Sequence, residues 1–183
     1  NFIYLGPMTE NMQEKVITKL KPYKERIEEL IEENVIFLIT GNAIEIFGKY
    51  IENEDGNKIE ALGVFDIYAK RDMLHRHNSI FIGKWDNIDI VGFKSQFTFA
   101  YGNNEEDYFA KVEKGIGLNK ESKLEGIMKN NFIGTYLIGP ILILNPLFTK
   151  KLLEKMGVKE KSLAFEEDLK VAYNQRLEEF KKL

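Results

Sequence analysis

The chain has 183 residues, 44% of them hydrophobic, and a formal net charge of −3. This length favours a single α/β domain with a sizeable core. Lysines and glutamates are interspersed, so the basic patch that nucleic-acid binding requires is missing, and we expect no nucleic-acid partner. The absence of cysteine excludes disulfides, thiolate zinc sites and thiol nucleophiles, and favours a cytoplasmic location. No apolar run reaches the roughly 18 residues that cross a bilayer, so we expect no membrane insertion.

The first third of the chain predicts a strand, two helices and a second strand. Residues 1–5 are apolar, and residues 11–34 have a helical period that Pro22 should break or kink. Residues 35–39 are continuously apolar, as in a strand buried on both faces of a parallel sheet. A sharp turn, "TGN", then leads into an expected helix over residues 43–50.

The middle of the chain, residues 59–101, carries alternating strand signals with a tight turn at residues 85–87, which indicates an antiparallel extension. On one regular strand, alternate residues share a face. We therefore expect an aromatic face, opposite a polar face with Lys94, Gln96 and Thr98. The aromatic face consists of Phe93, Phe97, Phe99 and Tyr101, and it is either a protein interface or part of the core.

The last third predicts one more buried strand and two helices. The first helix should begin at Asn145-Pro146, and the second should span about residues 165–180. The expected buried residues are Leu147, Phe148, Leu152, Leu153 and Met156 in the first helix, and Phe165, Leu169, Ala172, Leu177 and Phe180 in the second.

A series of blocks carries a family resemblance. "LITGNAIEIFGKYIENEDGNKIEALGVFDI" resembles the cysteine elbow "VCGGYQLLGKYY" and the strand that follows it. "GFKSQFTFAYG" is similar to "GFENHGG", "FIGTYLIGPILILNP" to "VIGTYLHGPLLPKNP", and "FIYLGPMTENMQ" to "FFLGGGQDREQ". These motifs belong to class I glutamine amidotransferases of the CobB/CobQ-like branch, which includes the glutaminase subunits of lipid II isoglutaminyl synthase.

The resemblance covers most of residues 1–153. It implies an open, flavodoxin-like, mostly parallel α/β sheet with an antiparallel strand extension. It also implies that residues 1–183 form one amidotransferase-like domain that lacks about fifty residues at its start.

In the family that the chain resembles, a cysteine thiolate attacks the amide of glutamine, a histidine moves the proton, and ammonia passes to a Mur ligase-like, ATP-using synthetase. Aligned without a gap, Gly41 falls at the nucleophile position and Ile138 at the histidine position. Neither residue can perform the chemistry. Thr40 is a weaker alternative nucleophile, and its other interpretation is an ordinary residue at the end of a strand.

The oxyanion loop of the family corresponds to Gly6, Pro7 and Met8, with Asn42 directly after the elbow. Pro7 has no N–H to donate. Gln96 falls where "GFENH" has its histidine, so a second histidine is replaced as well. The resemblance therefore predicts a retained scaffold in which glycine relaxes the elbow.

Other residues have a functional and a structural interpretation. Arg71 and Arg76 are candidates for binding a carboxylate such as that of glutamine, and the alternative is that they are ordinary surface arginines. His75 and His77 lack a third ligand nearby, so a solvated hairpin is favoured over a metal site. Glu45 aligns with the glutamine of the family's elbow helix and is expected to be solvated or to lie at a helix terminus.

We therefore expect a degenerate amidotransferase-like protein that binds or regulates a Mur ligase-like synthetase in cell-wall precursor amidation. One alternative is an active subunit that supplies ammonia to that synthesis or to a cobyrinate-type amidation, with its nucleophile altered in this sequence. Another is a sensor that binds glutamine without hydrolysing it. We expect no cofactor and no metal.

Overall fold

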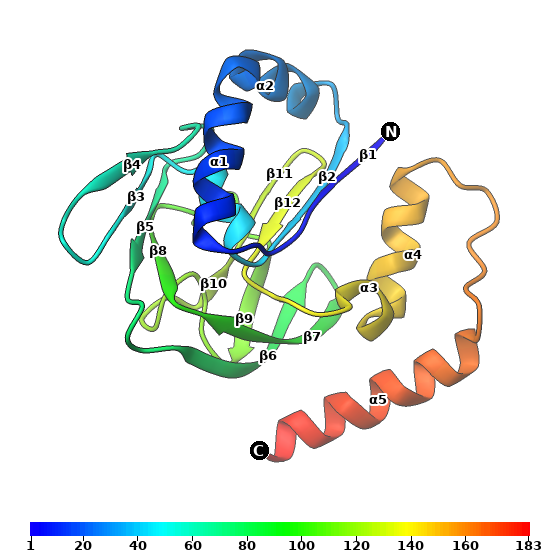
Figure 1. The fold of residues 1–183 in the computed structure, drawn as a ribbon. Coiled ribbons are helices and arrows are strands. Elements are labelled where there is room, and N and C mark those ends of the chain that lie inside the picture. Colours follow the sequence, from blue (N-terminus) through cyan, green and yellow to red (C-terminus); the bar gives the residue numbers. More distant parts are fainter.

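The computed structural model describes residues 1–183. A four-stranded sheet forms its centre, with the order β1-β2-β12-β11, in which β1, β2 and β12 run parallel and β11 pairs antiparallel with β12 (Figure 1). The strands are β1 (Phe2–Leu5), β2 (Ile36–Thr40), β11 (Ile127–Lys129) and β12 (Phe132–Thr135). All five side chains of β2 are buried, as expected for a central parallel strand.

The first two helices cover one face of this sheet. They are α1 (Glu10–Leu20) and α2 (Lys24–Glu32), joined by a 3₁₀ turn, η1 (Lys21–Tyr23). The predicted break at Pro22 is confirmed, because this proline lies in the first turn of η1, where its missing N–H costs nothing. Phe37 and Ile39 of β2 belong to the core on the helix side, whereas Ile36 and Leu38 belong to a second core on the opposite face.

Two further sheets contain the predicted antiparallel extension, and all their strand pairs are antiparallel except β3 with β5. One has the order β10-β9-β6-β7, and the other has the order β4-β3-β5-β8. Their strands are β3 (Tyr50–Glu52), β4 (Lys58–Glu60), β5 (Ile67–Arg71), β6 (His77–Trp85), β7 (Ile88–Gln96), β8 (Thr98–Gly102), β9 (Ala110–Lys114) and β10 (Leu124–Glu125). The tight turn between β6 and β7 is confirmed, and Asp86 adopts a φ of 53° in it.

The prediction of one regular aromatic strand is wrong. The chain leaves one sheet after Gln96 and enters another at Thr98, so the segment is two strands with different neighbours. Lys94, Gln96 and Thr98, which were expected on the polar outer face, are buried, whereas Phe93 is 38% exposed. Lys94 and Gln96 tolerate burial because their side chains donate hydrogen bonds to backbone carbonyls, and Thr98 lines a cavity.

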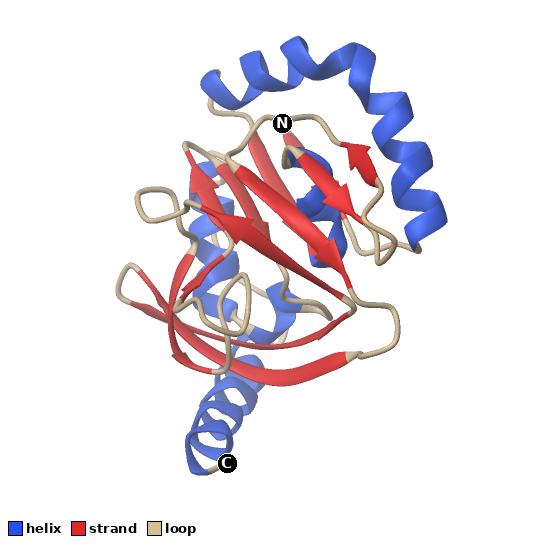
Figure 2. Ribbon diagram, turned by 90° about the vertical axis from the view of Figure 1, so that its left-hand side faces the viewer, coloured by secondary structure: helices blue, strands red, loops and turns tan.

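The C-terminal part contains α3 (Ile141–Leu144), α4 (Pro146–Lys155) and α5 (Glu166–Lys182). Leu147, Met156, Phe165 and Ala172 are exposed, contrary to expectation. In α5 only Tyr173 is buried, where the helix packs on β6 and β7. The Tyr173 hydroxyl donates to the Asp89 carbonyl at 2.7 Å. In Figure 2 the strands lie between helices α1 and α2 on one side and helix α5 on the other. None of the helices is both long and apolar enough to cross a membrane.

Candidate functional site

The elbow lies where β2 ends. Thr40 is extended, and Gly41 turns the chain sharply with a φ of 63°, a conformation that glycine adopts without steric cost. The helix expected over residues 43–50 is present, but it is a 3₁₀ helix with different bounds. It is η2 (Gly41–Phe47), and Tyr50 already begins β3. The apolar residues of this segment are buried on all sides, so their pattern did not distinguish the two kinds of helix.

Gly41 and Ile138, which the resemblance aligns with the nucleophile and the histidine of the family, lie next to each other. A Cβ added at Gly41 would lie 3.2 Å from Cγ2 of Ile138 and only 2.6 Å from Cβ of Pro7. Ile138 follows β12 and is held by its backbone N–H, which donates to the Phe93 carbonyl at 3.1 Å. Pro7 therefore occupies the space that a side chain at residue 41 would need.

The loop between β1 and α1 is locked to the elbow by Asn42. The Met8 backbone N–H donates to Oδ1 of Asn42 at 3.0 Å, and Nδ2 of Asn42 donates to the Met8 carbonyl at 2.8 Å. Because Pro7 has no N–H and the Met8 N–H is already bonded, neither residue offers an amide to an oxyanion.

A cavity of about 450 Å³ opens beside the elbow. It brings together residues that lie far apart in the sequence and that include most of the predicted site: Pro7, Met8, Gly41, Asn42, Arg76, Gln96 and Ile138. Gly6 and Thr40 do not line it, and Thr40 is buried with its hydroxyl 3.2 Å from that of Tyr4. Arg76 is exposed, with its guanidinium 4.5 Å from the centre of the Phe97 ring.

Arg71, the other candidate for carboxylate binding, lies outside this cavity. Its guanidinium donates to Gln13, Glu14 and Asn53 at 2.8 to 2.9 Å. These bonds make Arg71 a structural link between β5 and α1. His75 bonds to Asp72 on the exposed side of the same region.

Sequence reasoning missed Glu45 as a site residue. Its carboxylate is 1% exposed and lines the cavity, so the expectation of a solvated side chain is wrong. Oε2 accepts from Nε2 of Gln13 at 2.9 Å, and Oε1 accepts from the Tyr136 hydroxyl at 3.1 Å. Burial raises the pKa of Glu45 to about 7, although both hydrogen bonds act in the opposite direction.

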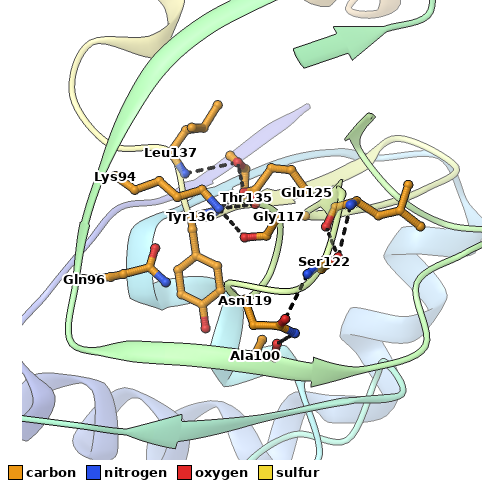
Figure 3. A network of polar contacts seen from close by, with 12 residues as sticks. Lys94, Gln96, Ala100, Gly117, Asn119, Ser122, Glu125, Thr135, Tyr136 and Leu137 are labelled. Carbon is orange, nitrogen blue, oxygen red and sulfur yellow. Dashed lines mark hydrogen bonds and ion pairs between the residues drawn. The ribbon is translucent and has the colours of Figure 1, made fainter. Parts of the chain in front are cut away.

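A buried ion pair supports the wall of the cavity (Figure 3). Lys94 donates to the Glu125 carboxylate and to the Gly117 carbonyl. Glu125 also accepts from the Tyr136 N–H and the Thr135 hydroxyl, both at 2.7 Å. Burial lowers the pKa of Lys94, and Glu125 opposes that shift. The pair fixes the segment after β12 that carries Tyr136 and Ile138.

Comparisons with known proteins agree with this geometry. The chain is 31% identical over 166 residues to the Staphylococcus aureus (strain N315) protein "Lipid II isoglutaminyl synthase (glutamine-hydrolyzing) subunit GatD". It is 28% identical over 177 residues to the Streptococcus pneumoniae (strain ATCC BAA-255 / R6) protein of the same name. Each match covers 91% of this chain, but it spans 67% and 66% of the relatives, about two thirds of their length.

A solved structure described as a glutamine amidotransferase shares the fold, with a TM-score of 0.57 and 13% identity over 86% of this chain and 79% of that one. No family model matches the chain. The fold class expected from the sequence is confirmed by this neighbour and by the parallel sheet with its antiparallel extension. From its sequence relatives, the chain belongs to the GatD family of lipid II isoglutaminyl synthase subunits.

Proposed function

We propose that this chain is a catalytically degenerate member of its family, which keeps the amidotransferase scaffold and cavity but does not hydrolyse glutamine. The observation that carries this proposal is the contact at the elbow. Gly41 has the positive φ of a nucleophile turn and lies next to Ile138. Pro7 occupies the space that a reactive side chain at residue 41 would need. A nucleophile and its base act as a unit, so losing both removes the chemistry.

The geometry gives little support to Thr40 as a replacement nucleophile. Its hydroxyl is buried against Tyr4 and does not line the cavity, so a substrate in the cavity would not meet it. No histidine or lysine lines the cavity to serve as its base, and Glu45 is already bonded to Gln13 and Tyr136. The alternative of an active glutaminase is therefore disfavoured.

The names of the relatives also suggest a partner protein for this chain. Both relatives are named as subunits of lipid II isoglutaminyl synthase, which implies a synthetase subunit beside each of them. We propose that this chain docks on a Mur ligase-like synthetase of cell-wall precursor amidation and holds or regulates it. The cavity remains available for a small ligand, with glutamine as one candidate.

Amide-¹⁵N glutamine tests the proposal. The chain should release no ¹⁵N-ammonium above a heat-denatured sample, either alone or mixed with a synthetase subunit, whereas an active GatD from Staphylococcus aureus serves as the positive control. A glutamine-derived diazo ketone should label no residue of the elbow by mass spectrometry. Turnover that stops when Thr40 is labelled would overturn the proposal.

A further inference from the structure

The cavity beside the elbow contains a carboxylate without a charged partner. Glu45 is 1% exposed, and its two oxygens accept from neutral groups only, the Gln13 amide and the Tyr136 hydroxyl. Arg71 does not bond to Glu45 and acts on it only through the longer-range coulombic attraction of its charge, while its guanidinium donates to Gln13. Buried carboxylates are usually paired with a cation, because an uncompensated charge is poorly solvated inside a protein.

A second acceptor in the same cavity lacks a donor. Gln96 is 6% exposed, and its Nε2 donates to the Thr98 carbonyl at 2.6 Å. Its Oε1 is buried and has no hydrogen-bond partner. Turning the amide over would place its oxygen against the Thr98 carbonyl oxygen, so the orientation that leaves an acceptor unpaired is the favoured one. Figure 3 shows this amide beside the Tyr136 ring, and both residues line the cavity.

The charges around the cavity favour a cationic group at its buried end. Its charged lining consists of Glu10, Glu45 and Arg76. Arg76 is exposed and lies against Phe97, so its positive charge is at the solvent side of the cavity, whereas Glu45 and Gln96 are buried. A primary ammonium carries three donors and no acceptor, which matches the unpaired oxygens better than an amide or a hydroxyl does.

We propose that Glu45 and Gln96 bind the primary ammonium group of a small amino acid-like ligand whose carboxylate faces Arg76. The inference rests on the proposed function, because it requires a cavity that binds rather than hydrolyses. The family's elbow motif has a neutral glutamine where this chain has Glu45, so this chain places a carboxylate at that position of the cavity.

The protonation state of Glu45 should control this binding. The groups around it are Gln13 and Glu10 from α1, Arg71 from β5 and Tyr136. Only the ionised carboxylate attracts an ammonium. Because burial raises the pKa of Glu45 to about 7, affinity should fall about tenfold between pH 8 and pH 6.

The test is titration of the full chain with 4-aminobutanoate, 5-aminopentanoate and 6-aminohexanoate, followed by NMR or calorimetry. The matched control ligand is 5-hydroxypentanoate, in which a hydroxyl replaces the ammonium. At least one amine should bind ten or more times more tightly than the hydroxy acid at pH 8. Glu45→Gln should abolish this preference and its pH dependence, and Gln96→Leu should weaken amine binding several-fold. Glu60→Gln, at an exposed carboxylate outside the cavity, should leave both unchanged.

Three results would each overturn the inference. They are equal binding of amine and hydroxy acid, no binding of any amine at millimolar concentration, and an unchanged preference in Glu45→Gln. L-glutamine in the same titration separates the two proposals. If glutamine binds equally to wild type and Glu45→Gln and is not hydrolysed, the ammonium site is wrong while the degenerate-subunit proposal stands. If ammonia is released, the degenerate-subunit proposal itself fails.

Discussion

Replacing Glu45 by glutamine should change how the stability of the protein depends on pH. The native pKa of Glu45 is raised from 4.5 to about 7, so between these values the native state holds a proton that the unfolded state has lost. The stability of the wild type therefore falls as pH rises through this range. At 1.36 kcal/mol per pKa unit, the loss amounts to about 3 kcal/mol, as an order of magnitude for a buried group.

Glu45→Gln removes this titration but keeps an acceptor for Tyr136. The difference in free energy of unfolding, variant minus wild type, should increase by about 3 kcal/mol from pH 4.5 to pH 8. Urea unfolding at several pH values measures it, and all other titrating groups cancel because both proteins contain them. Glu60→Gln is the control for a generic loss of negative charge. Parallel pH profiles for wild type and Glu45→Gln would refute the buried, unpaired carboxylate.

Two further predictions concern the wall of the cavity and the elbow. Lys94→Met should lower the free energy of unfolding by about 3–5 kcal/mol, because Glu125 is left buried and unpaired. Adding Glu125→Gln should recover most of this loss. If the two substitutions had additive effects in a double-mutant cycle, the pairing would be contradicted. Gly41→Cys should cost about 2–5 kcal/mol, since it combines a positive φ with the clash against Pro7. Adding Ile138→His to Gly41→Cys should still give no activity toward glutamine unless Pro7 is replaced as well. If the double variant released ammonia, the loop would leave room for the thiol.

Much of the elbow could be predicted from the sequence. A continuous apolar strand, a glycine and the spacing to "GTYLIGP" predicted that Gly41 and Ile138 belong to one site, because each lies in a short motif whose geometry is local. Their contact in the structure agrees with the alignment. The break between the first two helices was predictable for the same reason, since Pro22 acts on its own turn.

The buried polar residues could not be predicted in this way. Glu45 bonds to Gln13, 32 residues away, and Lys94 bonds to Glu125, 31 residues away. Periodicity assigns a charged side chain to the solvent face unless its partner is known, and these partners are visible only after the sheets have assembled. The change of sheet at Phe97 was missed because two short strands in succession have the same alternation as one long strand.

The most direct test of the central claim is to measure ammonium release from amide-¹⁵N glutamine by the full chain. The assay contains a synthetase subunit, its nucleotide and its acceptor substrate. The account predicts no release above that of a heat-denatured sample, because Gly41 and Ile138 provide neither nucleophile nor base and the Met8 N–H is bonded to Asn42. Sustained release of ¹⁵N-ammonium by the chain, above that of the heat-denatured sample, would contradict it.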